Sequence, residues 1–455
     1  MKRSDAAELL QFDFNHIWHP YTQMKDFEER PLLFIDRAEG IFLYDIDGNR
    51  YYDTISSWWC VIHGHNHPVI KKRIREQMDR LEQLHFAAAT HEGPIRLVKR
   101  LLPLLPESLT RFFFSDNGST ANEVALKISI QYWKQTGRPE REKFVSLERG
   151  YHGDTIGALS LGGVPFFEGP FSSLMFDSFK VPPPYCYRCP FGQDRERCQL
   201  QCADAVAELF SEHGQSIAAM IMEPMLIGAG GMISYPAPYL ERVGKLCREH
   251  GIHLILDEVA TGFGRTGKMF GFEHAGVQPD FLCLSKGLTG GYLPLALTVT
   301  TEQIYNAFYA DYSQGKTFFH GHTYTANPLG VAAALGSLDV FQQEQVVEKL
   351  PGRSACLQNG AARFQELEHV GDVRGIGMAA AFELVQDKDE KRPYDPDLRM
   401  GWQVYLAGLE KGLILRPLAD VVYLMPPLCI EPDQIEDILE RTYDTIRDVT
   451  AGVGG

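Results

Sequence analysis

The chain has 455 residues, which leaves room for two or three domains at about 100–200 residues each. Apolar residues make up 44% of the chain and charged residues 23%, a composition that excludes a disordered protein. The 44 basic and 59 acidic side chains give a net charge of −15. An acidic chain without a basic run is unsuited to binding nucleic acid or an anionic membrane.

The N-terminal segment predicts no secretory signal, because Asp5, Glu8 and Asp13 interrupt what would have to be an apolar run. The longest charge-free stretch, residues 317–338, contains histidines, an asparagine and a proline, so we expect no membrane span. The nine cysteines are an odd number in a long chain without a signal, which indicates reduced thiols. We therefore expect a cytoplasmic protein.

The predicted elements begin with two or three short strands within residues 33–53, where Asp47-Gly48 is a typical hairpin turn. From about residue 109, strand-like and helical stretches alternate. The stretch 119–135 predicts a helix, because its apolar residues recur every four positions. Uniformly apolar strands separated by helices indicate a parallel sheet covered on both faces. These strands are predicted within the stretches LTRFFFSDNG, KFVSLERGYHGDT, IAAMIMEP, IHLILDEV and DFLCLSKG.

Ligands of such sheets bind beyond the carboxyl ends of the strands, so the polar residues that follow each strand are the first candidates for a site. These residues are Asp116 to Ser119, Glu223, Asp257 and Lys286.

The C-terminal part of the chain, after about residue 335, differs from the middle. It contains long helical stretches and short strands near 373–384 and 421–425. We predict an α/β protein with a large, mostly parallel-sheet domain and a smaller α/β domain built from both termini. The predicted division is 1–70 for the N-terminal part of the small domain, 71–335 for the large domain and 336–455 for the C-terminal part of the small domain.

Lys286 and Asp257 offer complementary chemistry at neighbouring strand ends. Burial lowers the pKa of a lysine and frees its amine to act as a nucleophile. A carboxylate at a strand end can pair with a protonated pyridine nitrogen. Each residue alone could equally be structural. Gly287, Gly290 and Gly291 follow the lysine, and we expect them to leave space for a bulky group.

The sequence Asn117-Gly118-Ser119-Thr120 precedes the predicted helix at 119–135. Free backbone N–H groups at a helix N-terminus suit a phosphate, although Ser119 or Thr120 could simply cap the helix. Tyr151 follows a strand in RGYHGDT, where its ring could either stack on a planar cofactor or pack within the loop.

Three motifs in this order resemble the class III pyridoxal-phosphate-dependent aminotransferases. They are SDNGSTANEVALK, LILDEVATGFGRTG and LSKGLTGG, and the likeness extends over nearly the whole chain. The resemblance implies the type I aminotransferase fold, pyridoxal 5'-phosphate as cofactor, and a homodimer with shared active sites.

The resemblance also assigns roles to residues at the cofactor. Lys286 would hold the cofactor covalently and then move a proton as general base and acid. Asp257 would face the ring nitrogen, Gly118 and Ser119 would bind the phosphate, and Tyr151 would lie over the ring. His322 and Thr323, in HGHTYTANP, match cofactor ligands of the family, and Thr323 matches a phosphate ligand that the neighbouring subunit contributes.

Other segments are similar to the biotin-pathway branch of this family, which makes 7,8-diaminononanoate from 8-amino-7-oxononanoate. These segments are WHPYTQM, SSWWCVIHGHNHP and LRPLADVVYLMPPL. The resemblance implies that Arg416 binds the distal carboxylate of the substrate, as a planar guanidinium fork can. It also implies that Tyr21, Trp58, Tyr151, Lys286 and Gly321 line the substrate site. Core packing is the alternative for Trp58 and Trp59, and we expect at least one of them to be buried.

The branch leaves the amino donor open. Most of its members use S-adenosylmethionine and some use lysine, and we favour S-adenosylmethionine. Ornithine- and 4-aminobutyrate-type members usually carry a glutamate in the Gly-rich stretch after the Glu-Pro pair, where this chain has Ala229 in EPMLIGAGG. Four further alternatives are an ω-amino-acid:pyruvate aminotransferase, a mutase, a racemase, and a non-enzymatic binding protein on the same scaffold.

One segment, residues 182–202, fits none of these roles. Cys186, Cys189, Cys198 and Cys202 have the spacing C-x2-C-x8-C-x3-C, which could place four thiolates around zinc. A reduced Cys-rich surface loop is the alternative. The family requires no metal, and we assign none.

Overall fold

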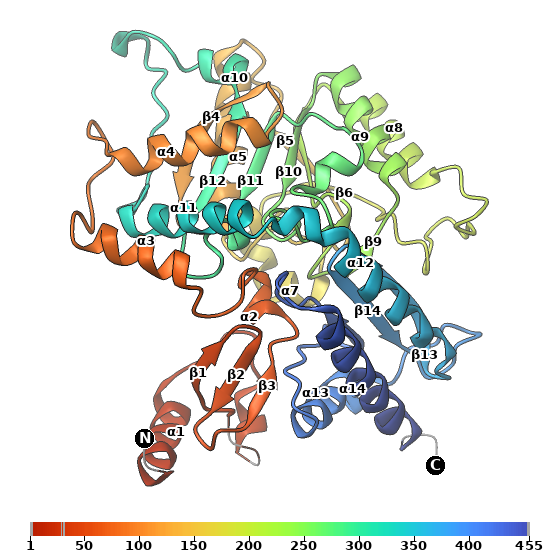
Figure 1. Ribbon diagram of the computed structural model, residues 1–455. Coiled ribbons are helices and arrows are strands. Elements are labelled where there is room, and N and C mark those ends of the chain that lie inside the picture. Colours follow the sequence, from red (N-terminus) through yellow and green to blue (C-terminus); the bar gives the residue numbers. More distant parts are fainter. Residues whose placement is uncertain (1–2, 29, 31, 453–455) are drawn as a thin grey trace.

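A seven-stranded sheet forms the centre of the computed structural model, which describes residues 3–28, 30 and 32–452 (Figure 1). Its strand order is β4-β12-β11-β10-β7-β5-β6. The strands are β4 (Leu109–Ser115), β5 (Lys143–Leu147), β6 (Phe179–Val181), β7 (Ile217–Met222), β10 (His253–Asp257), β11 (Phe281–Leu284) and β12 (Ala296–Thr301).

The sheet is parallel except for one strand. β5 pairs in parallel with β6 and β7, and β10 pairs in parallel with β7 and β11. β12 runs antiparallel to both β11 and β4, so the sheet is mostly parallel, as predicted. The apolar sequence of β12 does not reveal its direction, because a strand buried on both faces is apolar in either direction.

Helices cover both faces of this sheet, as its apolar strands require. In β10, Leu254 and Leu256 pack in one core cluster and Ile255 in another, because alternate side chains of a strand point to opposite faces. α5 (Gly118–Gln135) covers the Ile255 face through Val124 and its neighbours. The opposite face contacts α8 (Gln201–His213) and α9 (Ala237–His250).

Local signals fix the ends of these helices. Asn117 caps α5 by accepting a hydrogen bond from Thr120 N at 3.1 Å, and Thr120 Oγ1 accepts one in return from Asn117 N. The cap is therefore Asn117, two residues before Ser119 and three before Thr120, which were the alternatives. α9 ends at Gly251, whose φ of 60° is a left-handed conformation that glycine adopts at little cost.

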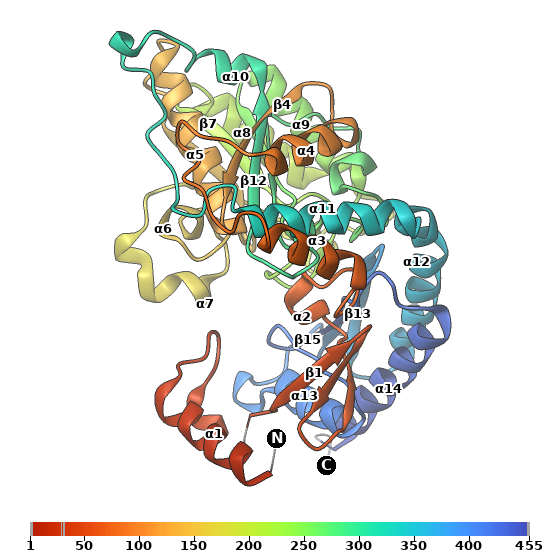
Figure 2. The same ribbon diagram turned by 60° about the vertical axis from the view of Figure 1, so that its left-hand side comes forward.

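Two small antiparallel sheets lie below the central sheet, one from each end of the chain (Figures 1 and 2). The strands of the first are β1 (Ile35–Glu39), β2 (Phe42–Asp45) and β3 (Arg50–Tyr52), and those of the second are β13 (Val370–Ile376), β14 (Ala379–Leu384) and β15 (Val421–Leu424). A further pair is β8 (Leu226–Ile227) with β9 (Ile233–Ser234).

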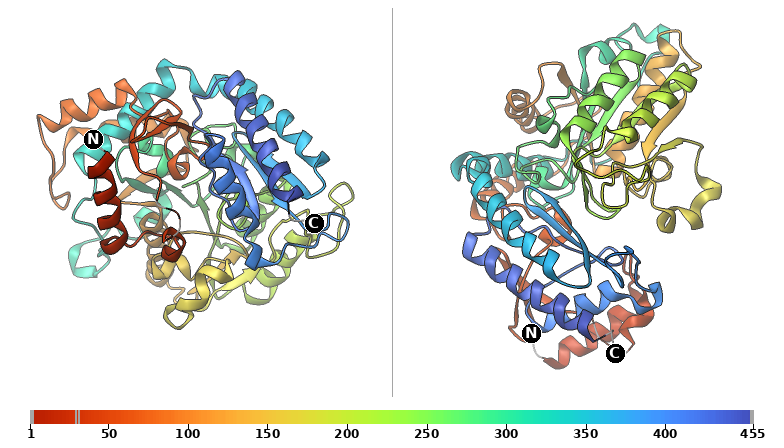
Figure 3. Two further views of the ribbon diagram at one scale, coloured as in Figure 1. Left: turned by 90° about the horizontal axis from the view of Figure 1, so that it is seen from below. Right: turned by 90° about the vertical axis from the view of Figure 1, so that its right-hand side faces the viewer.

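Backbone hydrogen bonds join the two terminal regions. Tyr52 N donates to Gly412 O at 2.9 Å, and Met425 N donates to Thr54 O at 2.7 Å. The N- and C-terminal segments therefore pack as neighbours, and both ends of the chain lie on the same side of the molecule (Figure 3). The division at residues 70 and 335 stays a prediction.

The remaining helices surround these sheets, and α11 packs along α3 and α4 beneath the central sheet. None of the helices among the described residues is long and apolar enough to cross a membrane. The remaining helices are α1 (Arg3–His16), α2 (Ser56–Trp59), α3 (Pro68–Met78), α4 (Glu92–Leu101), α6 (Ile156–Leu159), α7 (Pro165–Glu168), α10 (Glu302–Asn306), α11 (Pro328–Gln343), α12 (Val346–Ala362), α13 (Met400–Glu410) and α14 (Pro432–Ala451).

Candidate active site

A cavity of about 1590 Å³ opens at the carboxyl ends of the parallel strands. Its wall includes every residue that the strand ends predicted, because parallel strands end at the same edge of a sheet. The N-terminal segment and the stretch 416–421 complete the wall from the two ends of the chain. The predicted residues on the wall are Asp116, Asn117, Gly118, Ser119, Tyr151, Glu223, Asp257, Lys286, Tyr21, Trp58 and Arg416.

Asp257, at the end of β10, is held as a buried acceptor. It is 3% exposed, and its Oδ2 accepts hydrogen bonds from Asn122 Nδ2 and His152 Nδ1, both at 2.8 Å. Its Oδ1 accepts a hydrogen bond from Val259 N at 3.1 Å. These donors fix the direction in which the carboxylate points. Sequence reasoning missed Asn122, a helix residue without any motif, and missed His152, whose signal was its place beside Tyr151.

Lys286 lies directly after β11 in a left-handed conformation, with a φ of 44°. Its Nζ is 4.3 Å from the centre of the Trp59 ring. Burial lowers the pKa of Lys286, although the nearby carboxylates of Asp257 and Glu223 act in the opposite direction. A larger fraction of neutral amine is therefore available than at an exposed lysine.

At the glycines after Lys286 the chain's own core occupies the place that a side chain would take. A Cβ at Gly287 would lie 3.0 Å from Phe263, and one at Gly291 would lie 2.9 Å from Val61. Gly291 also lines the large cavity, and the expectation that these glycines leave space for a bulky group stays a prediction.

The N-terminus of α5 forms a narrow cradle on the cavity wall. A Cβ at Gly118 would lie 2.6 Å from Val259, so only glycine fits there. Ser119 Oγ is 2.7 Å from Thr155 Oγ1 and accepts a hydrogen bond from Thr155 N at 3.1 Å. The N–H groups of Gly118 and Ser119 precede the first bonds within the helix, so they are free to bind a phosphate.

Glu223, at the end of β7, joins two loops over the cavity. Its Oε2 accepts a hydrogen bond from Tyr151 N at 3.1 Å, and its Oε1 accepts one from Gly228 N at 2.9 Å. Burial and the charge of Asp257 raise the pKa of Glu223 to about 8, despite the opposing effect of the two N–H donors. Glu223 therefore carries a proton for part of the neutral pH range.

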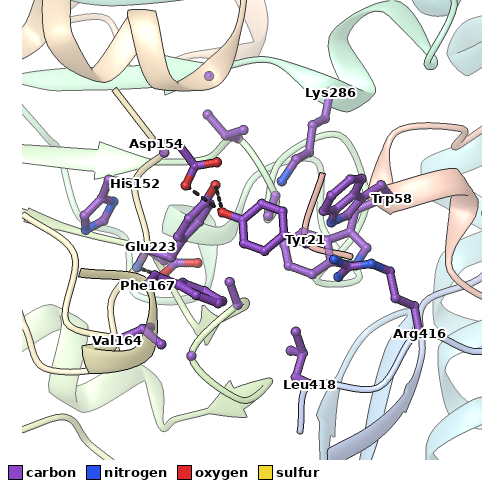
Figure 4. A pocket seen from close by; sticks show the side chains of 18 of the residues that line it. Tyr21, Trp58, His152, Asp154, Val164, Phe167, Glu223, Lys286, Arg416 and Leu418 are labelled. Carbon is purple, nitrogen blue, oxygen red and sulfur yellow. Dashed lines mark hydrogen bonds between the residues drawn. The ribbon is translucent and has the colours of Figure 1, made fainter. Parts of the chain in front are cut away.

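Aromatic side chains form the opposite wall (Figure 4). The Tyr21 hydroxyl donates to Asp154 Oδ1 at 2.6 Å and lies 3.4 Å from the Tyr151 hydroxyl. The Tyr21 ring lies edge-on to Trp58, with 5.7 Å between the ring centres, and edge-on to Phe167 at 5.3 Å. Sequence reasoning missed Asp154 and Phe167, whose roles depend on contacts far along the chain.

Arg416 lies over this wall. Its Cζ is 4.1 Å from the centre of the Trp58 ring, and no carboxylate in the described part of the chain lies within ion-pair distance of it. Arg416 also contacts the Tyr423 hydroxyl, but a stacked guanidinium without a carboxylate partner is available for a carboxylate of a ligand.

The backbone conformation places the adjacent side chains of Trp58 and Trp59 in different surroundings. Residues 56–59 all have positive φ, and Ser57 is tied to Asp53 through its N–H at 2.8 Å and its hydroxyl at 2.7 Å. Trp59 is 4% exposed and donates from Nε1 to the Tyr423 hydroxyl at 3.0 Å, whereas Trp58 is 37% exposed on the cavity wall. One tryptophan of the pair therefore packs in the core, as expected.

Gly321, His322 and Thr323 lie outside this cavity. Gly321 and Thr323 are exposed, and Thr323 O accepts a hydrogen bond from Gln83 Nε2 at 2.6 Å. His322 Nδ1 is 3.6 Å from Asp116 Oδ2. A single chain does not bring these three residues to Lys286, and their assignment stays a prediction.

The four cysteines of residues 182–202 line a second pocket of about 260 Å³, which shares Tyr185 with the large cavity. All four are free thiols. Within the described residues, no group of three or more His, Cys, Asp or Glu side chains is arranged to hold a metal ion. The geometry therefore gives no support to zinc at these cysteines.

Comparisons with known proteins agree with this geometry. The family described as aminotransferase class-III matches residues 24–446. A Geobacter sulfurreducens protein named adenosylmethionine-8-amino-7-oxononanoate aminotransferase is 44% identical over 449 residues, which are 98% of this chain and 99% of that protein.

Solved structures of transaminases also share the fold of this chain. The adenosylmethionine-8-amino-7-oxononanoate aminotransferase of Methanocaldococcus jannaschii has a TM-score of 0.93 and 41% identity, over 98% of this chain and 99% of that one. An omega transaminase from Pseudomonas jessenii in complex with PMP has a TM-score of 0.91 and 33% identity, over 98% of this chain and 100% of that one. The predicted fold class is confirmed.

Proposed function

The chain belongs to the class-III aminotransferase family, and from that premise we propose that it converts 8-amino-7-oxononanoate to 7,8-diaminononanoate, with S-adenosylmethionine as the amino donor. The observation that carries the proposal is the Arg416 guanidinium, which has no carboxylate partner among the described residues and is stacked on Trp58 in the same cavity as Lys286. An acceptor with a carboxylate at the end of an aliphatic chain matches an aromatic wall that ends in an arginine.

The enzyme is a pyridoxal-phosphate-dependent transaminase, as members of this family are. The residues present fit that cofactor. The Gly118–Ser119 cradle would hold the phosphate, Asp257 would pair with the ring nitrogen, and Tyr151 would cover the ring. Bound there, the cofactor supplies an electron sink for the carbon that loses its proton.

The chain's own groups then position and move protons. Neutral Lys286 would accept the proton of the substrate carbon at Nζ and deliver it to the carbon on the other side of the amine nitrogen. Asn122 and His152 hold the Asp257 carboxylate in place, so it does not have to reorient during the reaction.

The aromatic wall would orient the acceptor. Arg416 would bind its carboxylate through two parallel N–H donors, and Trp58 would cover its aliphatic chain. The Tyr21 hydroxyl, held by Asp154, would fix the ring that closes this side against water.

A homodimer with shared active sites follows from the same proposal. Gly321, His322 and Thr323 are outside the cavity of their own chain, and Gly321 and Thr323 are exposed, as residues that serve a partner subunit would be. Cytoplasmic location is part of the proposal and is supported by the nine free cysteines.

The test is product formation from 8-amino-7-oxononanoate with pyridoxal phosphate present, with S-adenosylmethionine and lysine supplied in parallel reactions. We expect diaminononanoate with S-adenosylmethionine. Product with lysine alone would keep the acceptor and correct the donor. No product with either donor, but turnover of an ω-amino acid with pyruvate, would replace the proposal with the activity of the ω-transaminase relatives.

A further inference from the structure

Part of the wall of the large cavity carries charged side chains that have no role in the reaction described above. We call it the polar end and define it by Arg149, Tyr185, Arg188, Arg374 and Glu383, all of which line the same cavity as Lys286. The inference drawn from it rests on the proposed transaminase function.

Two of the three arginines at the polar end are already paired. Arg374 Nη1 donates to Glu383 Oε2 at 2.8 Å and to Asp372 Oδ2 at 2.7 Å. Arg188 Nε donates to Glu383 Oε1 at 2.7 Å, and the Tyr185 hydroxyl donates to Oε2 of the same carboxylate. Two guanidiniums thus face two carboxylates, and this cluster is neutral without a ligand.

Arg149 is the arginine that remains. None of the described carboxylates lies within ion-pair distance of it, and the one hydrogen bond of its guanidinium, from Nη1 to Gly230 O, is long at 3.4 Å. Its Cζ lies 5.4 Å from the centre of the Tyr185 ring, and its side chain is exposed. Most of its N–H donors are therefore free, and its positive charge is not compensated.

The backbone holds Arg149 in this place at a cost. Its φ of 66° is left-handed, a conformation that disfavours any residue with a Cβ. Arg149 N donates to Gly163 O at 2.7 Å, and Gly230 packs so closely that a Cβ there would lie 1.8 Å from Arg149 O. A strained residue that the fold fixes on a cavity wall is typical of a functional position.

We propose that Arg149 binds the carboxylate of the amino donor, and that the donor is therefore a carboxylate-bearing amine such as an amino acid. Transamination requires one cavity to hold two different substrates in turn. Two arginines on the wall of one cavity, Arg416 for the acceptor and Arg149 for the donor, would let each substrate hold its carboxylate while its reacting carbon lies at Lys286. A planar guanidinium stacked beside a tyrosine ring is well suited to a carboxylate.

The test follows the two half-reactions separately by the change in cofactor absorbance, using enzyme loaded with its cofactor. The donors are lysine and S-adenosylmethionine, each paired with the same molecule lacking its carboxylate. In Arg149→Ala we expect kcat/KM for the carboxylate-bearing donor to fall about tenfold to a hundredfold, the usual effect of losing a charged hydrogen bond. The decarboxylated donor should lose less than about twofold, and the half-reaction with 8-amino-7-oxononanoate should stay unchanged.

Two further variants separate a binding role from a structural one. Arg149→Gly removes the side chain and also relieves the left-handed strain, so it folds at least as well as the parent enzyme and should show the same donor defect. Arg149→Lys keeps the charge and should restore part of the affinity.

Equal losses with both members of a donor pair, or an equal loss in the acceptor half-reaction, would overturn the assignment of Arg149. The failure of the proposed function has a different signature, because wild-type enzyme would then reject 8-amino-7-oxononanoate, while the donor half-reaction would still report on Arg149.

Discussion

The two sides of the large cavity are built differently. On the cofactor side, the carboxylates of Asp257 and Glu223 are at most 4% exposed, and each accepts at least two hydrogen bonds. On the aromatic side, Tyr21 is 47% exposed and Trp58 is 37% exposed, and Arg416 lacks a carboxylate partner among the described residues. The buried side is organised before any ligand arrives, whereas the aromatic side keeps its groups free for the ligand. Substitutions should therefore affect chemistry on the first side and affinity on the second.

The largest effect is expected at Lys286. Lys286→Ala should lower kcat by at least about ten-thousandfold, because it removes the group that moves the proton. The measurement is diaminononanoate formation, together with the visible absorbance of the bound cofactor. Lys245→Ala on the exposed face of α9 is the matched control and should leave both unchanged. Substantial turnover by Lys286→Ala would refute the assignment.

Asp257→Asn should come next, with kcat about a hundredfold to a thousandfold lower and KM little changed. The substitution keeps the shape of the side chain and removes the charge that faces the cofactor ring. Asp280→Asn, before β11 at the opposite edge of the sheet, is the control and should retain the parent kcat. An equal loss of kcat in both variants would contradict the role assigned to Asp257 beside the cofactor ring.

Arg416→Ala should raise KM for the acceptor about tenfold to a hundredfold, with a smaller change in kcat, because it removes a charged hydrogen-bond donor from the binding wall. Steady-state kinetics with varied acceptor give the two constants. Arg416→Lys should recover part of the affinity. A defect confined to kcat would mean that this side of the cavity takes part in the chemistry, which would break the contrast between the two sides.

Tyr21→Phe should lower kcat/KM only a few-fold, since it removes one hydrogen bond worth about 0.5–1.5 kcal/mol. Desolvation and Asp154 raise the pKa of Tyr21 to about 12, so its hydroxyl stays a donor across the working pH range. Asp154→Ala, which removes the acceptor, should have a similar effect. The double variant should lose little more than either single one, because both remove the same contact; fully additive losses would show that the two residues act independently.

The smallest effect concerns the dependence of stability on pH. Because the pKa of Glu223 is about 8 in the fold against an ordinary 4.5, the folded protein holds a proton that the unfolded chain releases in between. This contribution to stability is fully present below pH 4.5 and is lost as the pH rises through 8. Thermal unfolding of cofactor-free protein between pH 5 and pH 8 should therefore show a steeper fall in Tm for the parent than for Glu223→Gln. Parallel curves would mean that Glu223 is already ionised.

The sequence predicted the cofactor side better than the aromatic side. Asp116 to Ser119, Glu223, Asp257 and Lys286 were found from local patterns alone, since each directly follows an apolar strand, and such strand ends meet at one edge of a parallel sheet. The partners of Asp257 were not found, because Asn122 is 135 residues away along the chain and carries no motif.

Tertiary packing alone decided the rest. Tyr21 and Asp154 are 133 residues apart, and Arg149 became a candidate only when its neighbours Arg188 and Arg374 proved to be paired. The sequence also does not show that core side chains occupy the place of a side chain at Gly287 and Gly291, because those core residues come from other segments. Strand ends and helix caps are set by interactions within a few residues, so the sequence by itself determined where the chemistry lies. Which charges remain free and which rings meet depends on contacts between distant segments, and these exist only once the chain has folded.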